Sequence, residues 1–150
     1  MNEPLRRTVR VRCPPAHAFD VFTARLDLWW PPRHRRFATS QLVLEARVGG
    51  RFFERSTTGE EVRLGEVLQC EPPHRITYSW YPGALQGPTE VQVRFTAEGE
   101  HTLVEVTHSE GASHLGEAWP QKVELFGRAW AHVLPAFADF LHTPSQESVP

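Results

Sequence analysis

Three side chains in the middle of the chain, Glu54, Tyr78 and His108, have the residue types that acid–base chemistry requires. Each lies in a stretch where apolar residues alternate, so strand geometry decides whether it faces the interior or the solvent. An inward His108 could orient a ligand or move a proton near neutral pH. An inward Glu54 would need a partner such as Tyr78 or His108, because an unpaired buried charge is costly. The commoner alternatives are a core-edge histidine bonded to backbone and an outward, solvated carboxylate.

The residues that other kinds of reactive site require do not occur at the necessary spacing in this sequence. The eight histidines are scattered, and none belongs to an HExxH motif or to a Cys/His pair typical of structural zinc. Cys13 and Cys70 form no disulfide framework, and no base is tied to Cys13. The chain also contains no GxSxG motif and no phosphate-binding glycine loop. The sequence therefore predicts no metal, no cofactor and no nucleophilic catalysis.

The charge of the chain argues against two classes of partner. A formal net charge of −2 offers no overall attraction for nucleic acid or for an anionic membrane. The one local exception is the basic run from Arg33 to Arg36, which we interpret as a solvated loop or, alternatively, as an anion or partner contact. No run approaches the ~18 apolar residues that span a bilayer, and the first residues contain no apolar signal core. We expect a cytoplasmic protein that binds neither nucleic acid nor membrane.

Alternating apolar residues between turn signals predict seven strands. The turn signals are Gly49-Gly50, Thr58-Gly59, Pro72-Pro73 and Pro82-Gly83. The predicted strands span residues 5–12, 41–48, 51–56, 62–70, 74–81, 89–97 and 101–109.

Two helices complete the pattern. The first follows Pro14-Pro15 and runs to about Ala24, with a possible further turn over 27–30. The second spans 119–141, where apolar residues recur at steps of three and four, and Pro135 is expected to bend it. We expect residues 1–142 to form a single α+β domain and residues 143–150 to form a frayed tail. A strand, a helix, six antiparallel strands and a long final helix are the element order of the helix-grip fold.

Several segments of the chain resemble those of a known protein family. They are Val9–Phe22 (VRVRCPPAHAFDVF), Trp29-Trp30-Pro31, Glu45–Phe52 (EARVGGRF), Gly65–Trp80 (GEVLQCEPPHRITYSW), Val104–His108 (VEVTH) and Ala129–Leu141 (AWAHVLPAFADFL). In this order the chain resembles the Aha-type (activator of heat-shock-protein-90 ATPase homologue-like) family of the START/polyketide-cyclase (SRPBCC) superfamily. Members often carry glycine before the helix tryptophan, where this chain has Ala129. The resemblance implies a START-like, seven-stranded antiparallel sheet curled round a long C-terminal helix.

A helix-grip domain leaves a cavity between its sheet and its last helix, and strand parity predicts the residues that line it. Mostly apolar walls with a few polar groups are the usual composition of a small-molecule pocket. Trp29 and Trp30 either pack the short helix onto the sheet or form a gate at the cavity mouth. The predicted ligand-binding residues are Trp29, Trp30, Phe52, Glu54, Tyr78, Trp80, Phe95, His108, Phe126 and Trp130.

Three functions fit this pattern. The first is a binding protein for a hydrophobic or aromatic small molecule. The second is a cyclase/dehydratase-type enzyme that uses Glu54, Tyr78 or His108 as acid or base. The third, implied by the resemblance, is an interaction module for a chaperone or a regulator in the stress response, or one that forms a homodimer. A convergent Glu54–His108 pair in the cavity would favour the enzyme, whereas purely apolar walls would favour the binding protein.

Overall fold

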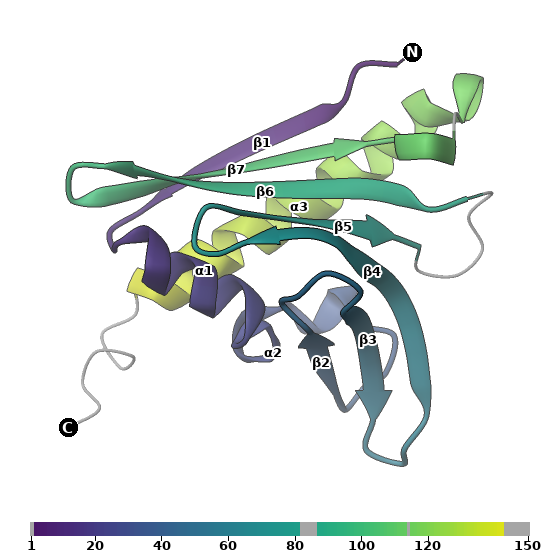
Figure 1. The fold of residues 1–150 in the computed structure, drawn as a ribbon. Coiled ribbons are helices and arrows are strands. Elements are labelled where there is room, and N and C mark those ends of the chain that lie inside the picture. The colour runs from purple at the N-terminus through teal and green to yellow at the C-terminus, as the bar shows by residue number, and fades with distance from the viewer. Residues whose placement is uncertain (1, 82–86, 114, 143–150) are drawn as a thin grey trace.

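The computed structural model describes residues 2–81, 87–113 and 115–142, and within them it contains one antiparallel sheet and a long C-terminal helix (Figure 1). The strands are β1 (Leu5–Val11), β2 (Ser40–Leu44), β3 (Arg51–Ser56), β4 (Glu61–Glu71), β5 (Arg75–Trp80), β6 (Thr89–Glu98) and β7 (His101–Ser109). The α-helices are α1 (Pro15–Thr23), α2 (Leu26–Trp29) and α3 (Trp119–His142). Short 3₁₀ turns are η1 (Pro32–His34), η2 (Gly111–Ser113) and η3 (Gly116–Ala118). The predicted α+β helix-grip fold is confirmed; the predicted tail over 143–150 lies outside the described residues.

The sheet is a meander extended by the first strand. Its order is β1-β7-β6-β5-β4-β3-β2, and every neighbouring pair is antiparallel. Helix α3 crosses one face of this sheet and contacts β1, while α1 contacts β6 and α2 contacts β2 (Figure 1). Both short helices also contact α3. The side chains of the sheet and of three helices therefore meet in one interior.

Irregular pairing along β4 curls the sheet. The register shifts between Phe52 and Phe53 where β3 meets β4, and again between Val67 and Gln69 where β4 meets β5. Such bulges bend a strand and increase its twist, and β4 is visibly bent in Figure 1. Gly65 lies between the two shifts, and a Cβ atom there would collide with the Ser79 carbonyl. Glycine at this position thus permits the close approach of β4 and β5.

The alternation expected from strand parity is seen in the burial of the central strands. Ile76, Tyr78, Val91, Val93 and Val104 are fully buried. Period-two side chains from β5, β6 and β7 therefore form one continuous apolar layer beneath α3.

One predicted strand is too long. We expected a strand over 41–48, but β2 ends at Leu44 and Val48 is 68% exposed. The chain turns at Gly49, whose φ of 83° suits glycine, and the Gly49 N–H donates to the Val67 carbonyl of β4 (2.9 Å). Val48 matched the alternation of the strand only by coincidence, because the backbone had already left the ladder.

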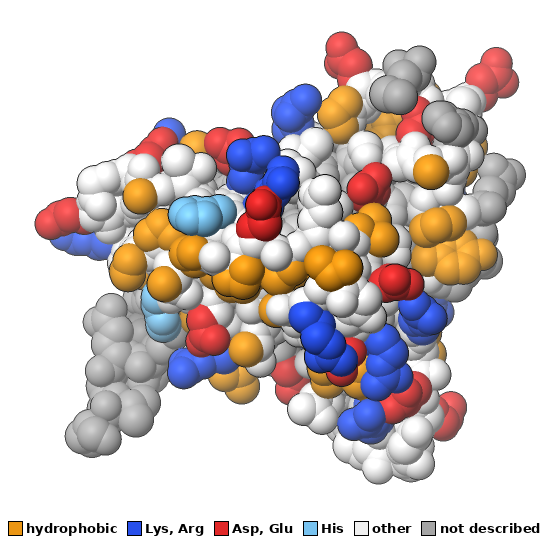
Figure 2. Space-filling model, in the orientation of Figure 1, with side chains coloured by type: hydrophobic (Ala, Val, Ile, Leu, Met, Phe, Trp, Pro, Cys, Tyr) orange, Lys and Arg blue, Asp and Glu red, His pale blue; other side chains and the backbone are white. Residues whose placement is uncertain are grey.

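The charged surface over β3 and β4 is mixed. Figure 2 shows Lys/Arg and Asp/Glu side chains interspersed there, and Arg55–Glu61 (2.6 Å) and Arg63–Glu66 (2.9 Å) form ion pairs. No helix in the described part of the chain is both long enough and apolar enough to cross a membrane.

Candidate functional site

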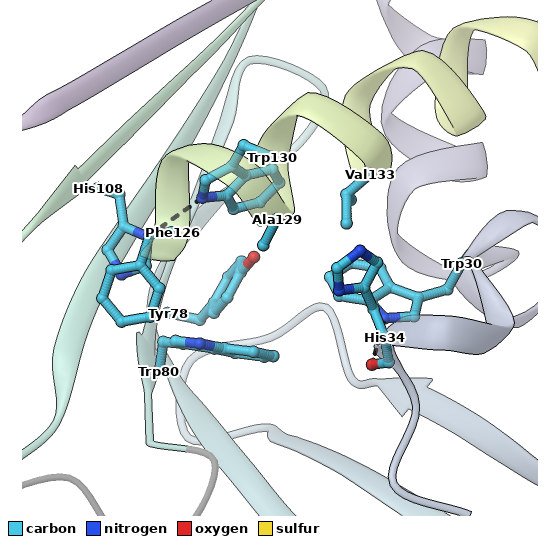
Figure 3. Close-up of a pocket in the computed structure, with 9 residues that line it drawn as sticks. All are labelled: Trp30, His34, Tyr78, Trp80, His108, Phe126, Ala129, Trp130 and Val133. Carbon is cyan, nitrogen blue, oxygen red and sulfur yellow. Dashed lines mark hydrogen bonds between the residues drawn. The ribbon is translucent and has the colours of Figure 1, made fainter. Parts of the chain in front are cut away.

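A cavity of about 80 Å³ lies between the sheet and α3 (Figure 3). Strand β5 supplies Tyr78 and Trp80, and β7 supplies His108. The remaining walls come from α3 and from the segment after α2. The described residues that line the cavity are Trp30, His34, Tyr78, Trp80, His108, Phe126, Ala129, Trp130 and Val133.

The exposure of these side chains locates the mouth of the cavity. Three of them, His34, Trp80 and Ala129, are only half-buried, whereas the other six are buried. The half-buried residues must border the solvent, so the mouth lies between β5, α3 and the loop that carries His34. Trp30, considered above as a gate, is buried and forms part of the wall.

His108 is a hydrogen-bonded, neutral residue in the wall of the cavity. The Trp130 indole N–H can only donate, and it donates to His108 Nδ1 (3.1 Å). The proton is therefore on Nε2, which donates to Thr89 Oγ1 (2.8 Å), and the Thr89 hydroxyl in turn donates to the Trp80 carbonyl (3.0 Å). Burial lowers the pKa of His108 to about 3. Both ring nitrogens are engaged, so neither is free to accept a proton from a ligand.

Tyr78 differs from the other polar residues of the wall. Its side chain is fully buried, and its hydroxyl oxygen has no hydrogen-bond partner among the described residues. Burial raises the pKa of the phenol, which keeps the hydroxyl protonated. Figure 3 shows the ring extending from β5 with the hydroxyl directed toward α3, among the side chains that line the cavity.

Glu54 is buried away from the lining of the cavity. Its Oε1 accepts a hydrogen bond from the Arg36 N–H (2.9 Å), and its Oε2 accepts bonds from the Phe37 N–H (3.0 Å) and the Ser40 hydroxyl (2.7 Å). The carboxylate thus fastens the segment between α2 and β2 to strand β3. The structure does not bring Glu54 and His108 together in the cavity wall.

The same segment holds His34 at the mouth. The Trp30 indole N–H donates to the His34 carbonyl (3.1 Å), and the His34 ring meets the His132 ring of α3 with Nε2 and Nδ1 3.4 Å apart. Desolvation, His132 and Arg33 lower the pKa of His34. Arg35 is not a solvated residue as expected for this basic run: it is largely buried and pairs with Asp27 (2.6 Å).

Of the ten predicted ligand-binding residues, six line the cavity and four do not. The six are Trp30, Tyr78, Trp80, His108, Phe126 and Trp130. Besides Glu54, three aromatic residues lie outside the lining. Trp29 packs against both Phe22 and Phe137, and Phe95 packs on Phe19 and Phe22. The ring of Phe52 contacts the rings of Trp80 and Tyr78.

Three residues of the cavity lining are not among the ten predicted ligand-binding residues. Val133 belongs to the apolar stripe of the final helix, which was expected to close the cavity from the helix side. Ala129 lies three residues after Phe126 and four before Val133, so helical spacing could have indicated it as well. His34 lies in the basic run after Pro31-Pro32, which has no periodicity, so no signal in the sequence places it at the cavity. Within the described ranges, no group of three His, Cys, Asp or Glu side chains could hold a metal ion.

No curated protein matches the chain. An anthrahydroquino-gamma-pyrone synthase, Txn09, solved in complex with a ligand, is 31% identical, with a TM-score of 0.62 over 92% of this chain and 96% of that chain. CalU16 from Micromonospora echinospora is 24% identical, with a TM-score of 0.66 over 91% of this chain and 72% of that chain, and shares the fold.

A further similar structure is an Hsp90 activator from Plasmodium falciparum. It is 25% identical, with a TM-score of 0.54 over 73% of this chain and 74% of that chain. The model of the family described as "Activator of Hsp90 ATPase homolog 1-like protein" matches residues 12–141. That match spans most of the chain, from the end of β1 to the last turn of α3, and the chain therefore belongs to this family.

Proposed function

We propose that this protein binds an uncharged, aromatic small molecule in the cavity between the sheet and α3. The observation that carries the proposal is the composition of the walls. Trp30, Trp80, Phe126 and Trp130 present aromatic rings to the cavity, and none of the described residues that line it is Lys, Arg, Asp or Glu. Aromatic walls with few polar groups are typical of sites for flat, hydrophobic ligands.

The size of the cavity limits the ligand. A cavity of roughly 150 Å³ is known to hold benzene, whereas this cavity measures about 80 Å³. A single aromatic ring therefore needs some displacement of the wall, and a larger ligand must extend through the mouth. Ala129 and His34, both half-buried at that mouth, are the side chains that such a ligand would meet.

An enzymatic role is the second candidate, and the similarity to a synthase at 31% identity favours it. The name of that relative describes a fused-ring product, which also agrees with a flat ligand. In this chain, however, both ring nitrogens of His108 already form hydrogen bonds. Both carboxylate oxygens of Glu54 accept hydrogen bonds as well, and Glu54 is not among the lining residues. Tyr78 is the one predicted acid–base residue that both lines the cavity and keeps an unpaired polar atom, so a reaction would depend on it.

Action on a chaperone is a third proposal. It is supported by the family description and by the similar Hsp90 activator. Isothermal titration against an Hsp90 chaperone would test it independently of ligand binding, and a homodimer would be detected by the mass measured in light scattering.

Toluene is a suitable probe for the binding proposal. Titration of the ¹⁵N-labelled protein should give saturable shifts at Tyr78, Trp80 and Trp130. Ala129→Leu should block the mouth and abolish them. The matched variant Ala131→Leu lies on the exposed side of the same helix and should bind toluene like the wild type. Wild-type protein without saturable shifts at these residues would refute the proposal.

A second measurement searches for the natural ligand. Native mass spectrometry of freshly purified protein should show an added mass that Ala129→Leu lacks and Ala131→Leu retains. The same added mass in both variants would place the bound molecule outside this cavity.

A further inference from the structure

The Tyr78 hydroxyl is a fully buried polar atom of the cavity wall that has no hydrogen-bond partner among the described residues. Among the described residues, two buried side-chain polar atoms lack one, Thr77 Oγ1 and Tyr78 Oη. Neighbouring residues of a strand point to opposite faces, and Thr77 borders a separate depression with Leu68 and Gln69. Of the two atoms, only the Tyr78 oxygen belongs to the cavity under α3.

Neighbouring polar atoms do not compensate for this hydroxyl. His108 bonds to Trp130 and Thr89, and the Trp30 indole bonds to the His34 carbonyl. A buried hydroxyl without a hydrogen bond is unfavourable, because it gave up its bonds to water on folding. Such an atom at the wall of a cavity is suited to a bond with a guest molecule.

The charge of the walls restricts that guest. In the described part of the chain, neither Lys nor Arg lines the cavity. His108 is held neutral by burial and by the hydrogen bond that its Nδ1 accepts from Trp130. Burial together with His132 and Arg33 disfavours the charged form of His34 by lowering its pKa. A buried anion without a counter-charge is strongly unfavourable. A carboxylate would therefore bind poorly, whereas a neutral oxygen would not carry this cost.

We propose that the Tyr78 hydroxyl donates a hydrogen bond to an uncharged acceptor oxygen of the ligand, so that this cavity selects aromatic carbonyl compounds. This inference rests on the proposed binding function and deepens it: Tyr78 is the specificity-determining residue. The aromatic walls contact the ring faces of the ligand, and the hydroxyl fixes its orientation. Because the phenol is a donor at neutral pH, the complementary group is a ketone or a similar acceptor.

A matched pair of ligands isolates this hydrogen bond. Acetophenone and α-methylstyrene have nearly the same shape, but one has C=O where the other has C=CH₂. Their dissociation constants are measured by NMR titration with wild type and with Tyr78→Phe. For each protein, the dissociation constant of α-methylstyrene is divided by that of acetophenone. The hydration of the free ligands contributes equally to both ratios, so it cancels when the two proteins are compared. The remaining difference is the coupling between the hydroxyl and the carbonyl.

The wild type should prefer acetophenone to α-methylstyrene, and this preference should be on the order of tenfold larger than the preference of Tyr78→Phe. Benzoate, tested at pH 7 as the charged analogue, should bind wild type at least about tenfold more weakly than acetophenone. Tyr78→Phe should melt at the wild-type temperature or above it, since the substitution removes an unpaired buried hydroxyl.

The outcomes separate this inference from the proposed function. If both neutral ligands bound, and the ratio of their dissociation constants were the same in wild type and in Tyr78→Phe, the proposed role of Tyr78 would be overturned. Binding of aromatic ligands would remain supported. An equal loss of affinity for both ligands in Tyr78→Phe would show a merely structural role and would also overturn it. Benzoate binding as tightly as acetophenone would overturn the preference for uncharged ligands. If neither neutral ligand bound the wild type, the proposed function itself would fail.

Discussion

His108 connects the two halves of the cavity wall. Its ring accepts a hydrogen bond from Trp130 on α3, and through Thr89 it is linked to the Trp80 carbonyl on β5. Its ring also stacks on Phe126, with centroids 4.1 Å apart. These contacts hold helix and sheet at a fixed separation, so the residue positions the aromatic walls and is not available as a proton acceptor.

The neutral state of His108 predicts a stability that depends on pH. Its pKa is about 3 in the folded protein and about 6.5 in an unfolded chain. Between these values the unfolded state binds the proton and the folded state does not, so stability is lost as pH falls below about 6.5. Each pH unit well below 6.5 should cost about 1.4 kcal/mol, and the step from pH 7 to pH 6 about half of that. Urea denaturation at pH 7, 6 and 5 measures the slope.

The control for this prediction is His108→Gln. A glutamine amide offers one acceptor for Trp130 and one donor for Thr89, but it does not titrate. The variant should therefore lose less stability than the wild type between pH 7 and pH 5, and His34, which still titrates, would account for part of the remaining slope. Identical slopes for the two proteins would show that His108 is not the acid-sensitive group.

Trp130 should be important for stability at the same contact. Its side chain is buried and its indole N–H bonds to His108. Trp130→Ala should lower the free energy of unfolding by about 3–5 kcal/mol, the range for removing a large aromatic side chain from a core. Trp130→Phe, which keeps most of the apolar contact but not the N–H donor, should cost less in the same urea titration. A midpoint unchanged in Trp130→Ala would contradict the buried position.

At the scale of elements, the segment from α2 to β2 shows how the mouth of the cavity is built. It contains little regular structure, yet Glu54 binds two of its backbone N–H groups and Arg35 ties it to Asp27. His34 and Trp30 depend on this segment for their positions. A carboxylate that the sequence suggests as a catalytic group thus contributes to the site by holding the loop.

Replacing Glu54 should loosen this segment. Glu54→Leu leaves the Arg36 and Phe37 N–H groups without their acceptor, and each lost partner costs about 1–3 kcal/mol where it is buried. We expect a loss of about 2–5 kcal/mol and faster hydrogen exchange over residues 35–40. Glu54→Gln retains one carbonyl oxygen as acceptor and should fall between wild type and Glu54→Leu. Unchanged exchange over 35–40 would contradict the anchoring role.

Some features of the structure could be predicted from the sequence and others could not, and the difference has a physical reason. Strand parity placed Tyr78, Trp80 and His108 on the inner face, and helical spacing placed Phe126 and Trp130 opposite them, because both patterns follow directly from backbone geometry. The end of β2 and the position of His34 depend on a glycine turn and on bonds between distant segments. Such tertiary contacts leave no periodic trace in the sequence.

At the scale of the whole molecule, the fold places a cavity of about 80 Å³ between α3 and the sheet, and the side chains that line it limit this volume. Ala129 adds a methyl group at the mouth. Members of the Aha-type family often have glycine at this position. The overall architecture follows from the order of strands and helices, whereas the volume of the cavity is set by single side chains such as this one. The fold therefore permits a larger cavity than this chain has.

Ala129→Gly should enlarge the cavity at its mouth and admit a larger ligand. We expect 2-acetylnaphthalene, the two-ring counterpart of acetophenone, to gain severalfold in affinity over wild type, while acetophenone changes little. Glycine costs about 1 kcal/mol of helix stability, so Ala131→Gly on the exposed side of α3 serves as the matched control: it should lose similar stability and gain no affinity. NMR titration gives the dissociation constants and urea denaturation gives the stabilities. An equal affinity of both variants for 2-acetylnaphthalene would show that the Ala129 methyl group does not limit the size of the ligand.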